Sequence, residues 1–449
     1  MHLPQRLLAG FLFSAALTSG AAPVAAQSCA NLSAGGGALN GEYRTATGVL
    51  ISVLPADTPD QLRVVHFQAG HADVLLPVGS LVYRANSNPA LGTPTTRTYA
   101  FKAEQAGTAA RLMITARGRP PQVATRMALQ ERDTTIQSGD VQLAARLTLP
   151  ANGRGPFKTV IYVHGSDPIP SVGREWLPHL LAARGVATLV FDKRGTGCST
   201  GRYVQHFGVL SDDVVAAARW LRTQPEVRAD AIGLAGFSQG GWVAPLAATK
   251  EPAIRFVAVA YGLAMSLADE DRLEAPLKLR ARGLSDADLQ EFETLNASLH
   301  RVARAGFKDW TELEQQLSDF KDRKWLSIAA QEHSWVGVLL QMGLPQAKIA
   351  APGMFKDFFQ PFYEPVPTLE SLNIPMLWLI AGKDIEAPPE LTLAALDRLQ
   401  RQGKPLTVRV FPNADHGMQD FIVIDGRRAP TGYAKGYFAS LAAWIDAQR

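Results

Sequence analysis

Cysteines, long apolar stretches and blocks of one charge are all scarce in this 449-residue sequence. Two cysteines, Cys29 and Cys198, are too few for a disulfide framework. The 45 Lys and Arg and the 41 Asp and Glu are mixed along the chain, so the net charge of +4 comes without a basic block for nucleic acid. Beyond residues 1–26 no apolar stretch approaches the ~20 residues of a membrane-spanning helix, so we expect no stable span after this segment.

Two common kinds of enzyme site are also missing. A metallohydrolase would need clustered His and carboxylate ligands, and no H-E-x-x-H pattern is present. The first predicted parallel strand, 159–163, is followed by His164-Gly165-Ser166 and not by the G-x-G-x-x-G of a dinucleotide site. We therefore expect neither a metal nor a cofactor.

The amino terminus has the order of a secretory signal peptide. Arg6 precedes the apolar run 7–17, and small residues ending at Ala26 follow. We predict cleavage after Ala26 and export to the periplasm or the medium. The alternative is an uncleaved membrane anchor, although the apolar run is too short to span a bilayer. For Cys29 and Cys198 we expect two unpaired thiols, with a disulfide between them or a lipid anchor on Cys29 as alternatives.

The pattern of apolar segments changes near residue 130. Residues 27–130 contain short alternating apolar segments with turn residues between them, which predicts a small β-rich, antiparallel domain without a catalytic signature. Residues 131–449 alternate strands with helices, which indicates an α/β fold with a mostly parallel, doubly wound sheet. The predicted strands are 141–149, 159–163, 186–191, 232–235, 256–260, 376–380 and 406–410. The predicted helices between them are 176–183, 210–221 and 391–399.

The strand–helix rhythm breaks at about residues 263–370. This region is rich in charged, helix-forming sequence, with helices predicted at 267–281, 285–299 and 309–322. We interpret it as a helical cap inserted into the α/β domain, where it would bound a substrate pocket. The alternative is a solvated helical decoration without a role at the site.

The strongest motif follows the strand 232–235. Gly236, Ser238 and Gly240 match G-x-S-x-G between an apolar strand and a helical stretch. A serine whose hydroxyl projects from such a tight turn needs glycine two residues to either side, because larger side chains would collide. The helix amino terminus also supplies N–H groups and a positive dipole end for a developing oxyanion. We predict that Ser238 is a nucleophile; a chance glycine-rich turn is the alternative.

This segment resembles the nucleophile elbow of the α/β-hydrolase superfamily, and residues 141–449 as a whole are similar to its fold. His164-Gly165-Ser166 resembles the oxyanion loop of that family. The resemblance implies that the backbone N–H groups of Ser166 and Gln239 hold the oxyanion and that His164 is structural. Residues 191–199 resemble the Asp-x-Arg-Gly-x-Gly-x-Ser turn of esterases and serine aminopeptidases, and we interpret them as a structural turn beside the site.

A serine nucleophile needs a base that a buried acid holds in one tautomer. The superfamily has the chain order nucleophile, acid, histidine. Asp384 follows the strand 376–380 where the acid stands, with Glu386 as a competitor, and His416 follows the strand 406–410 where the histidine stands. Six other histidines lie off any such strand end and are expected to be surface or core residues: His66, His71, His179, His206, His300 and His333.

The resemblance implies a serine hydrolase in which Ser238 attacks an acyl carbon, His416 moves the proton and Asp384 orients the imidazole. We predict small-molecule carboxylic esters as substrates, with peptides, including those of an aminopeptidase, or thioesters as alternatives. A binding protein without turnover is an alternative of another class. An aminopeptidase would hold the substrate amine with cap carboxylates. We expect these carboxylates to be solvated instead: Glu270, Asp271, Glu274, Glu291 and Glu293.

Overall fold

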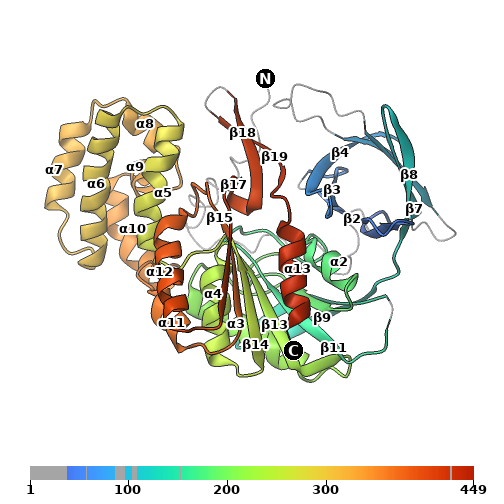
Figure 1. Ribbon diagram of the computed structural model, residues 1–449. Helices are drawn as coiled ribbons and strands as arrows, with labels where there is room; N and C mark the ends of the chain where they lie inside the picture. The colour runs from blue at the N-terminus through green and yellow to red at the C-terminus, as the bar shows by residue number, and fades with distance from the viewer. Residues whose placement is uncertain are drawn as a thin grey trace.

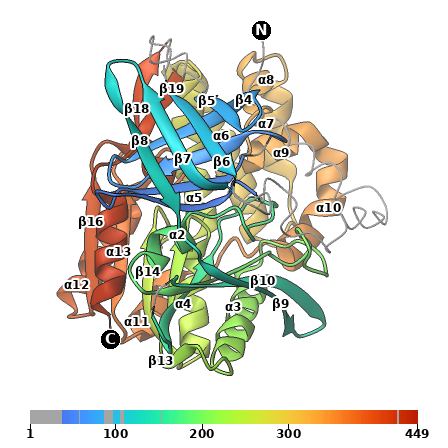
Figure 2. The ribbon, with the colours of Figure 1, turned by 90° about the vertical axis from the view of Figure 1, so that its right-hand side faces the viewer.

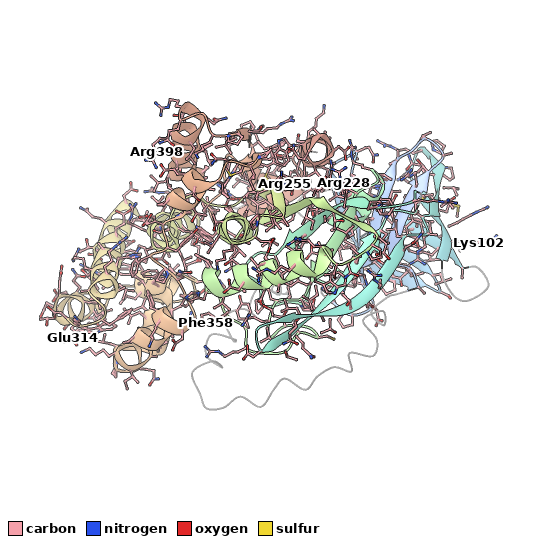
Figure 3. All side chains as sticks on the ribbon, turned by 90° about the horizontal axis from the view of Figure 1, so that it is seen from below. Lys102, Arg228, Arg255, Glu314, Phe358 and Arg398 are labelled. Carbon is pink, nitrogen blue, oxygen red and sulfur yellow. The ribbon has the colours of Figure 1, made fainter. Side chains whose placement is uncertain are left out.

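The computed structural model describes residues 38–56, 58–85, 97–103, 109–151, 153–424 and 427–448. The predicted signal peptide and Cys29 lie outside these residues. An amino-terminal barrel and a helical cap lie on opposite sides of a central α/β domain (Figure 1). Seen from below, Lys102 of the barrel and Glu314 of the cap mark the two ends of the molecule (Figure 3). Within the described ranges no helix is long and apolar enough to cross a membrane.

The β-rich domain expected before residue 130 is a closed antiparallel barrel, in which the first strand pairs with the last. Alternate residues of its strands, such as Tyr43, Val64 and Leu112, are fully buried in its interior. Closure leaves no open sheet edge to pair with another chain. Its strands are β1 (Gly41–Thr45), β2 (Leu50–Pro55), β3 (Leu62–His66), β4 (His71–Gly79), β5 (Val82–Ala85), β6 (Thr98–Ala103), β7 (Ala109–Ala116) and β8 (Arg119–Arg126).

The central domain is built on an eight-stranded sheet in the order β16-β15-β14-β13-β11-β12-β10-β9. Strand β10 is antiparallel to both of its neighbours, and the strands from β12 to β16 run parallel. The expected mostly parallel sheet is therefore confirmed. The strands are β9 (Gln130–Ser138), β10 (Val141–Leu149), β11 (Phe157–Val163), β12 (Ala187–Phe191), β13 (Val227–Phe237), β14 (Ile254–Ala260), β15 (Met376–Ala381) and β16 (Leu406–Phe411).

Strand β15 shows why the central strands are continuously apolar. Its residues Met376, Trp378 and Ile380 join the core on one face of the sheet, and the alternate residues join the core on the other face. Helices α3 (Phe207–Leu221), α4 (Gly240–Lys250), α11 (Pro365–Ser371) and α12 (Pro389–Arg401) contribute to the first core. Helices α2 (Leu177–Ala182) and α13 (Tyr437–Ala447) contribute to the second. A strand covered on both faces has no solvent-facing position to fill with a polar residue.

The insertion between β14 and β15 is helical, as expected, and has an apolar core of its own around Phe292 and Trp325. Serine side chains cap three of its helices by accepting a backbone N–H: Ser266, Ser285 and Ser334. The cap helices are α5 (Leu267–Ala281), α6 (Asp286–Arg304), α7 (Thr311–Phe320), α8 (Trp325–Ala329), α9 (Trp335–Met342) and α10 (Leu344–Asp357).

The barrel is packed onto the α/β domain above α2 (Figure 2). Phe67 at the end of β3 makes edge-to-face contacts with Trp176 and Phe438, at ring-centroid distances of 6.1 and 5.0 Å. Ser52 hydrogen-bonds the buried His179 of α2 at 2.5 Å. Because Phe67, Trp176 and Phe438 belong to one buried apolar cluster, the barrel shares a core with the sheet and is not a loosely tethered module.

Two features depart from the sequence expectations. A three-stranded sheet follows β16 between barrel and cap (Figure 1), formed by β17 (Ala414–Asp415), β18 (Gln419–Ile424) and β19 (Arg427–Tyr433). It was not predicted, because its strands are short and largely exposed. Cys198 is disulfide-bonded. The expectation of an unpaired thiol at Cys198 is therefore wrong.

Candidate active site

Ser238 lies on a strained turn between β13 and α4. Its φ of +52° is in the left-handed region that side chains with a Cβ avoid. A Cβ on Gly236 would lie 2.4 Å from the carbonyl oxygen of Gly240, and one on Gly240 would lie 2.5 Å from that of Val163. Both glycines are thus sterically required. The turn raises the Ser238 side chain above the carboxyl ends of the parallel strands, where ligands of open α/β sheets bind.

The structure brings Ser238, His416 and Asp384 together from three loops that follow β13, β16 and β15. The Nε2 atom of His416 lies 3.1 Å from the Ser238 hydroxyl, and Nδ1 lies 2.8 Å from the Asp384 carboxylate. The other oxygen of Asp384 accepts the backbone N–H groups of Glu386 and Ala387 at 2.9 and 2.8 Å. Asp384 is buried, and these donors fix its carboxylate in the plane that faces the imidazole.

Glu386, the competing acid, lies on the other side of the imidazole. Its carboxylate is 4.0 Å from Nε2 of His416, the nitrogen that faces the serine. Burial disfavours the charged form of His416, but the charge and hydrogen bond of Asp384 outweigh this, and Glu386 and Glu274 add to them, so that the pKa of His416 rises to about 9. Asp384 therefore orients the ring, whereas Glu386 contributes only charge.

The predicted oxyanion groups lie beside the serine. Gly165 is packed against Ser238, since a Cβ on Gly165 would lie 3.5 Å from that of the serine. Ser166 follows in the same loop, and Gln239 precedes the first turn of α4, whose N–H groups have no partner within the helix. His164 is buried edge-on against Phe191 at 4.9 Å. Burial, and then the charge of Lys193, lowers the pKa of His164 well below its usual range, so this ring is neutral, as a structural residue would be.

The cap carboxylates are not solvated as a group, which corrects the sequence expectation. Glu270 and Glu274 lie one turn apart on α5 and close to the triad, because the charge of Asp384 acts on Glu270 and that of Glu274 acts on His416. Burial raises the pKa of both carboxyl groups above the usual range, although Lys278, which is paired with Glu274, opposes the shift.

The remaining cap carboxylates are structural or exposed. Asp271 is buried, pairs with His300 at 2.9 Å and accepts the N–H of Trp335 at 2.8 Å. Glu291 accepts from the indole of Trp325 at 2.9 Å. Glu293 is exposed. The spacing of four residues between Glu270 and Glu274 was the available signal that these two share a helix face.

The other histidines make contacts in the barrel, the α/β domain or the cap, away from the triad. His66 bonds Tyr99 and His71 bonds Asp73, both in the barrel. His206 caps α3, and His333 is exposed. Over the residues that the structure describes, no group of three or more His, Cys, Asp or Glu side chains could hold a metal ion.

One neighbour of the triad was not predicted. The ring of Tyr261 meets that of His416 edge-on at a centroid distance of 5.0 Å. Tyr261 follows β14, and its φ of +43° turns it toward the site. The sequence did contain a signal for Tyr261, because a residue directly after a parallel strand lies at the carboxyl edge of the sheet, where the site is.

The sheet, the elbow and the inserted cap define a member of the α/β-hydrolase superfamily. The sequence model described as "X-Pro dipeptidyl-peptidase (S15 family)" matches residues 121–353, just over half of the chain. The protein therefore belongs to the S15 family of serine hydrolases. The matched range includes Ser238 and ends before Asp384 and His416.

Among curated proteins, an uncharacterized 31.7 kDa protein in the traX-finO intergenic region of Escherichia coli is 25% identical over 252 residues, which cover 55% of this chain and 79% of that protein. Among solved structures, the hypothetical protein PA2218 from Pseudomonas aeruginosa has a TM-score of 0.43 at 19% identity, covering 72% of this chain and 94% of that one. Acylaminoacyl peptidase of Pyrococcus horikoshii has a TM-score of 0.43 at 13% identity, and the match covers 89% of this chain and 58% of that one. The Pyrococcus furiosus esterase Pf2001 has a TM-score of 0.41 at 16% identity, and the match covers 71% of this chain and 88% of that one.

Proposed function

We propose that this protein is an exported serine hydrolase that cleaves carboxylic esters through an acyl-enzyme. The observation that carries the proposal is the hydrogen-bonded chain from Ser238 through His416 to Asp384, with distances of 3.1 and 2.8 Å. These distances lie within the range in which a base can take the proton of a nucleophile.

The reaction runs in two halves. The Ser238 oxygen attacks the ester carbonyl carbon while its proton passes to Nε2 of His416, and the imidazolium then protonates the leaving alkoxide. In the second half the same nitrogen takes a proton from a water molecule, whose oxygen attacks the acyl carbon. The imidazolium then protonates the Ser238 oxygen as its bond to the acyl carbon breaks and the carboxylic acid leaves. Asp384 holds Nδ1–H and stabilises the imidazolium, and the N–H groups of Ser166 and Gln239 donate to the oxyanion.

The test is a substrate panel together with an active-site label. Purified protein should hydrolyse p-nitrophenyl esters and react with a fluorophosphonate, while Ser238→Ala should do neither. The kcat/KM values for thioesters and anilides of the same acyl groups show which bond the protein hydrolyses fastest. Absence of both turnover and labelling in the native protein would leave the fold with a binding role only.

A second candidate, a peptidase that requires a free substrate amine, is favoured by the position of the cap carboxylates. The charges of Glu274 and Glu386 act on His416 and that of Asp384 acts on Glu270, while Lys278 pairs with Glu274. An ammonium group on the acyl part of the substrate would find a site rich in negative charge. The matched family is also named for a peptidase, X-Pro dipeptidyl-peptidase.

The two candidates are separated by Glu274→Gln. In the peptidase the variant should raise KM for aminoacyl anilides by about tenfold and leave KM for simple acyl esters unchanged, because only the former carry the cation. Glu293→Gln, an exposed glutamate on the neighbouring helix α6, is the matched control. Equal KM values for amine-bearing and N-acetylated substrates in the native protein would exclude the amine requirement.

A further inference from the structure

Lys193 is a buried lysine beside the candidate site. It follows β12 within the glycine-rich turn 191–199, and only 1% of its surface is exposed. Its ammonium donates to the carbonyl oxygen of Gly165 at 2.6 Å. Burial of a lysine is costly unless the charge has partners, so its position requires an explanation beyond packing.

The carbonyl that Lys193 holds belongs to the same peptide unit as the N–H of Ser166. In a planar trans peptide the C=O and the N–H point in opposite directions, so a donor on the carbonyl fixes the direction of the N–H. A cation on the carbonyl also polarises the peptide and strengthens the N–H as a donor. Gly165 in turn is packed against Ser238.

The next peptide unit is held as well. The hydroxyl of Tyr203 donates to the carbonyl oxygen of Ser166. Its ring lies 5.1 Å from the Lys193 ammonium, within cation–π distance. Two side chains from the loop after β12 thus fix the peptide units on both sides of Ser166.

We propose that Lys193 positions the oxyanion hole: its ammonium holds the Gly165–Ser166 peptide so that the N–H points at the reacting carbonyl oxygen. The proposal rests on the proposed function, because it assumes an oxyanion at Ser238. Lys193 does not touch the substrate; it acts through the peptide and through its charge, which favours a negative oxygen over a neutral carbonyl.

Charged groups from each neighbouring element act on this lysine. Burial lowers the pKa of Lys193 to about 7, while Asp167 and Glu175 of the loop after β11 favour the charged form. His164 is neutral, and burial keeps the pKa of Tyr203 above its usual range. The lysine is therefore cationic below a pH of about 7 and neutral above it.

The test compares three variants on an ester substrate. Lys193→Met should lower kcat about 10- to 100-fold with KM changed less than about threefold, because positioning is lost but ground-state contacts remain. Lys193→Gln keeps a donor without the charge and should recover part of kcat. Tyr203→Phe should lower kcat by a smaller factor of about three to ten, since the hydrogen bonds that it removes, to the Ser166 carbonyl and from the Gln205 amide, are between neutral groups.

Two further readouts separate positioning from stability. A trifluoromethyl ketone, which forms a tetrahedral oxyanion on the serine, should lose affinity in parallel with kcat, while a ground-state amide inhibitor should not. The ratio of native kcat to that of Lys193→Gln should fall as pH rises from 6 to 9, because the native lysine loses its charge. The increase of kcat with pH that comes from deprotonation of His416 is the same in the native protein and in Lys193→Gln, so it cancels in this ratio.

Lys158→Met is the matched control. Lys158 likewise donates to backbone carbonyls, those of Ile445 and Asp446 at 2.9 and 2.8 Å, but at the opposite end of β11. It should alter thermal stability without altering kcat. Native-like kcat in Lys193→Met, or equal losses for the ketone and the amide inhibitor, would overturn the proposal. If Lys193→Met does not fold, a native-like kcat in Tyr203→Phe and a pH-independent ratio for Lys193→Gln would do so. Failure of the proposed function would differ, because the native protein itself would not turn over ester or label.

Discussion

The pKa of His416 offers a quantitative test of the triad. At about 9 it exceeds the ordinary histidine value of ~6.5, so the surroundings of His416 favour the charged ring by about 3 kcal/mol. Catalysis needs the neutral ring, and kcat/KM reports the protonation of the free enzyme. We expect kcat/KM to rise with pH toward a midpoint near 9, and not near the ordinary histidine value.

Asp384→Asn removes the largest favourable contribution to this shift. Burial then lowers the pKa of His416 with only Glu386 and Glu274 opposing it, so the midpoint of kcat/KM should move to lower pH. The plateau should fall ~10³- to 10⁴-fold, because asparagine does not enforce the Nδ1–H tautomer. The assay is initial-rate hydrolysis of a non-ionisable ester between pH 5 and 10.

Asp415→Asn is the control for general charge effects. Asp415 precedes His416 in the chain, but its carboxylate pairs with Arg428 at 2.7 Å. It should leave both midpoint and plateau near their native values. A native midpoint near 6.5 that Asp384→Asn does not move would refute the assignment of Asp384 as the group that orients His416.

The same pKa predicts a stability profile. Because the folded-state pKa of His416 lies above the unfolded value, its ion pair stabilises the fold fully below about pH 6.5, and this contribution is lost as pH rises through about 9. The native melting temperature should therefore fall over this interval more than that of Asp384→Asn. Differential scanning calorimetry at low ionic strength measures the difference.

Two further predictions concern the elbow and the sheet. Ser238→Ala should lower kcat by several orders of magnitude with the melting temperature retained, and adding His416→Ala should lower kcat little further, because triad members act as a unit; additive losses would contradict this. Gly233→Ala in β13 should lower the free energy of unfolding by about 1–3 kcal/mol, since its Cβ would lie 2.0 Å from the ring of Phe256. Gly353→Ala, with open space around its Cβ in helix α10, should be neutral or stabilising in the same urea titration.

Much of the α/β domain could be predicted from sequence because its strands are buried on both faces. Strand β10 was predicted with its observed bounds, and β15 to within one residue. Such strands form uninterrupted apolar runs between turn residues, which single-sequence patterns detect well. The exposed hairpin β18–β19 carries no such signal, because its outer half has no buried face to enforce a pattern.

The surroundings of the candidate site were harder to predict than its three central residues. Ser238, Asp384 and His416 stand directly after strands, so topology alone implies that they meet at one edge of the sheet. Glu274 reaches the same place from an inserted helix whose orientation depends on packing between cap and domain. The sequence of helix α5 is charged and has no distinct apolar face, so no local pattern states which of its faces is covered.

The barrel also bears on the site, although its sequence has no catalytic motif. Arg63 of β3 donates to the carbonyl of Arg174 at 2.8 Å, and its charge acts on the half-buried Glu175 and on Tyr261. Tyr261 is the ring that meets His416 edge-on. A cation from the barrel therefore acts on the ring that contacts His416 and offsets the charge of Glu175. Loss of the Arg63 charge would leave the carboxylate of Glu175 without this compensation, in a region that already contains the carboxylates near the triad. The barrel thus belongs to the electrostatic environment of the candidate site as well as to its scaffold.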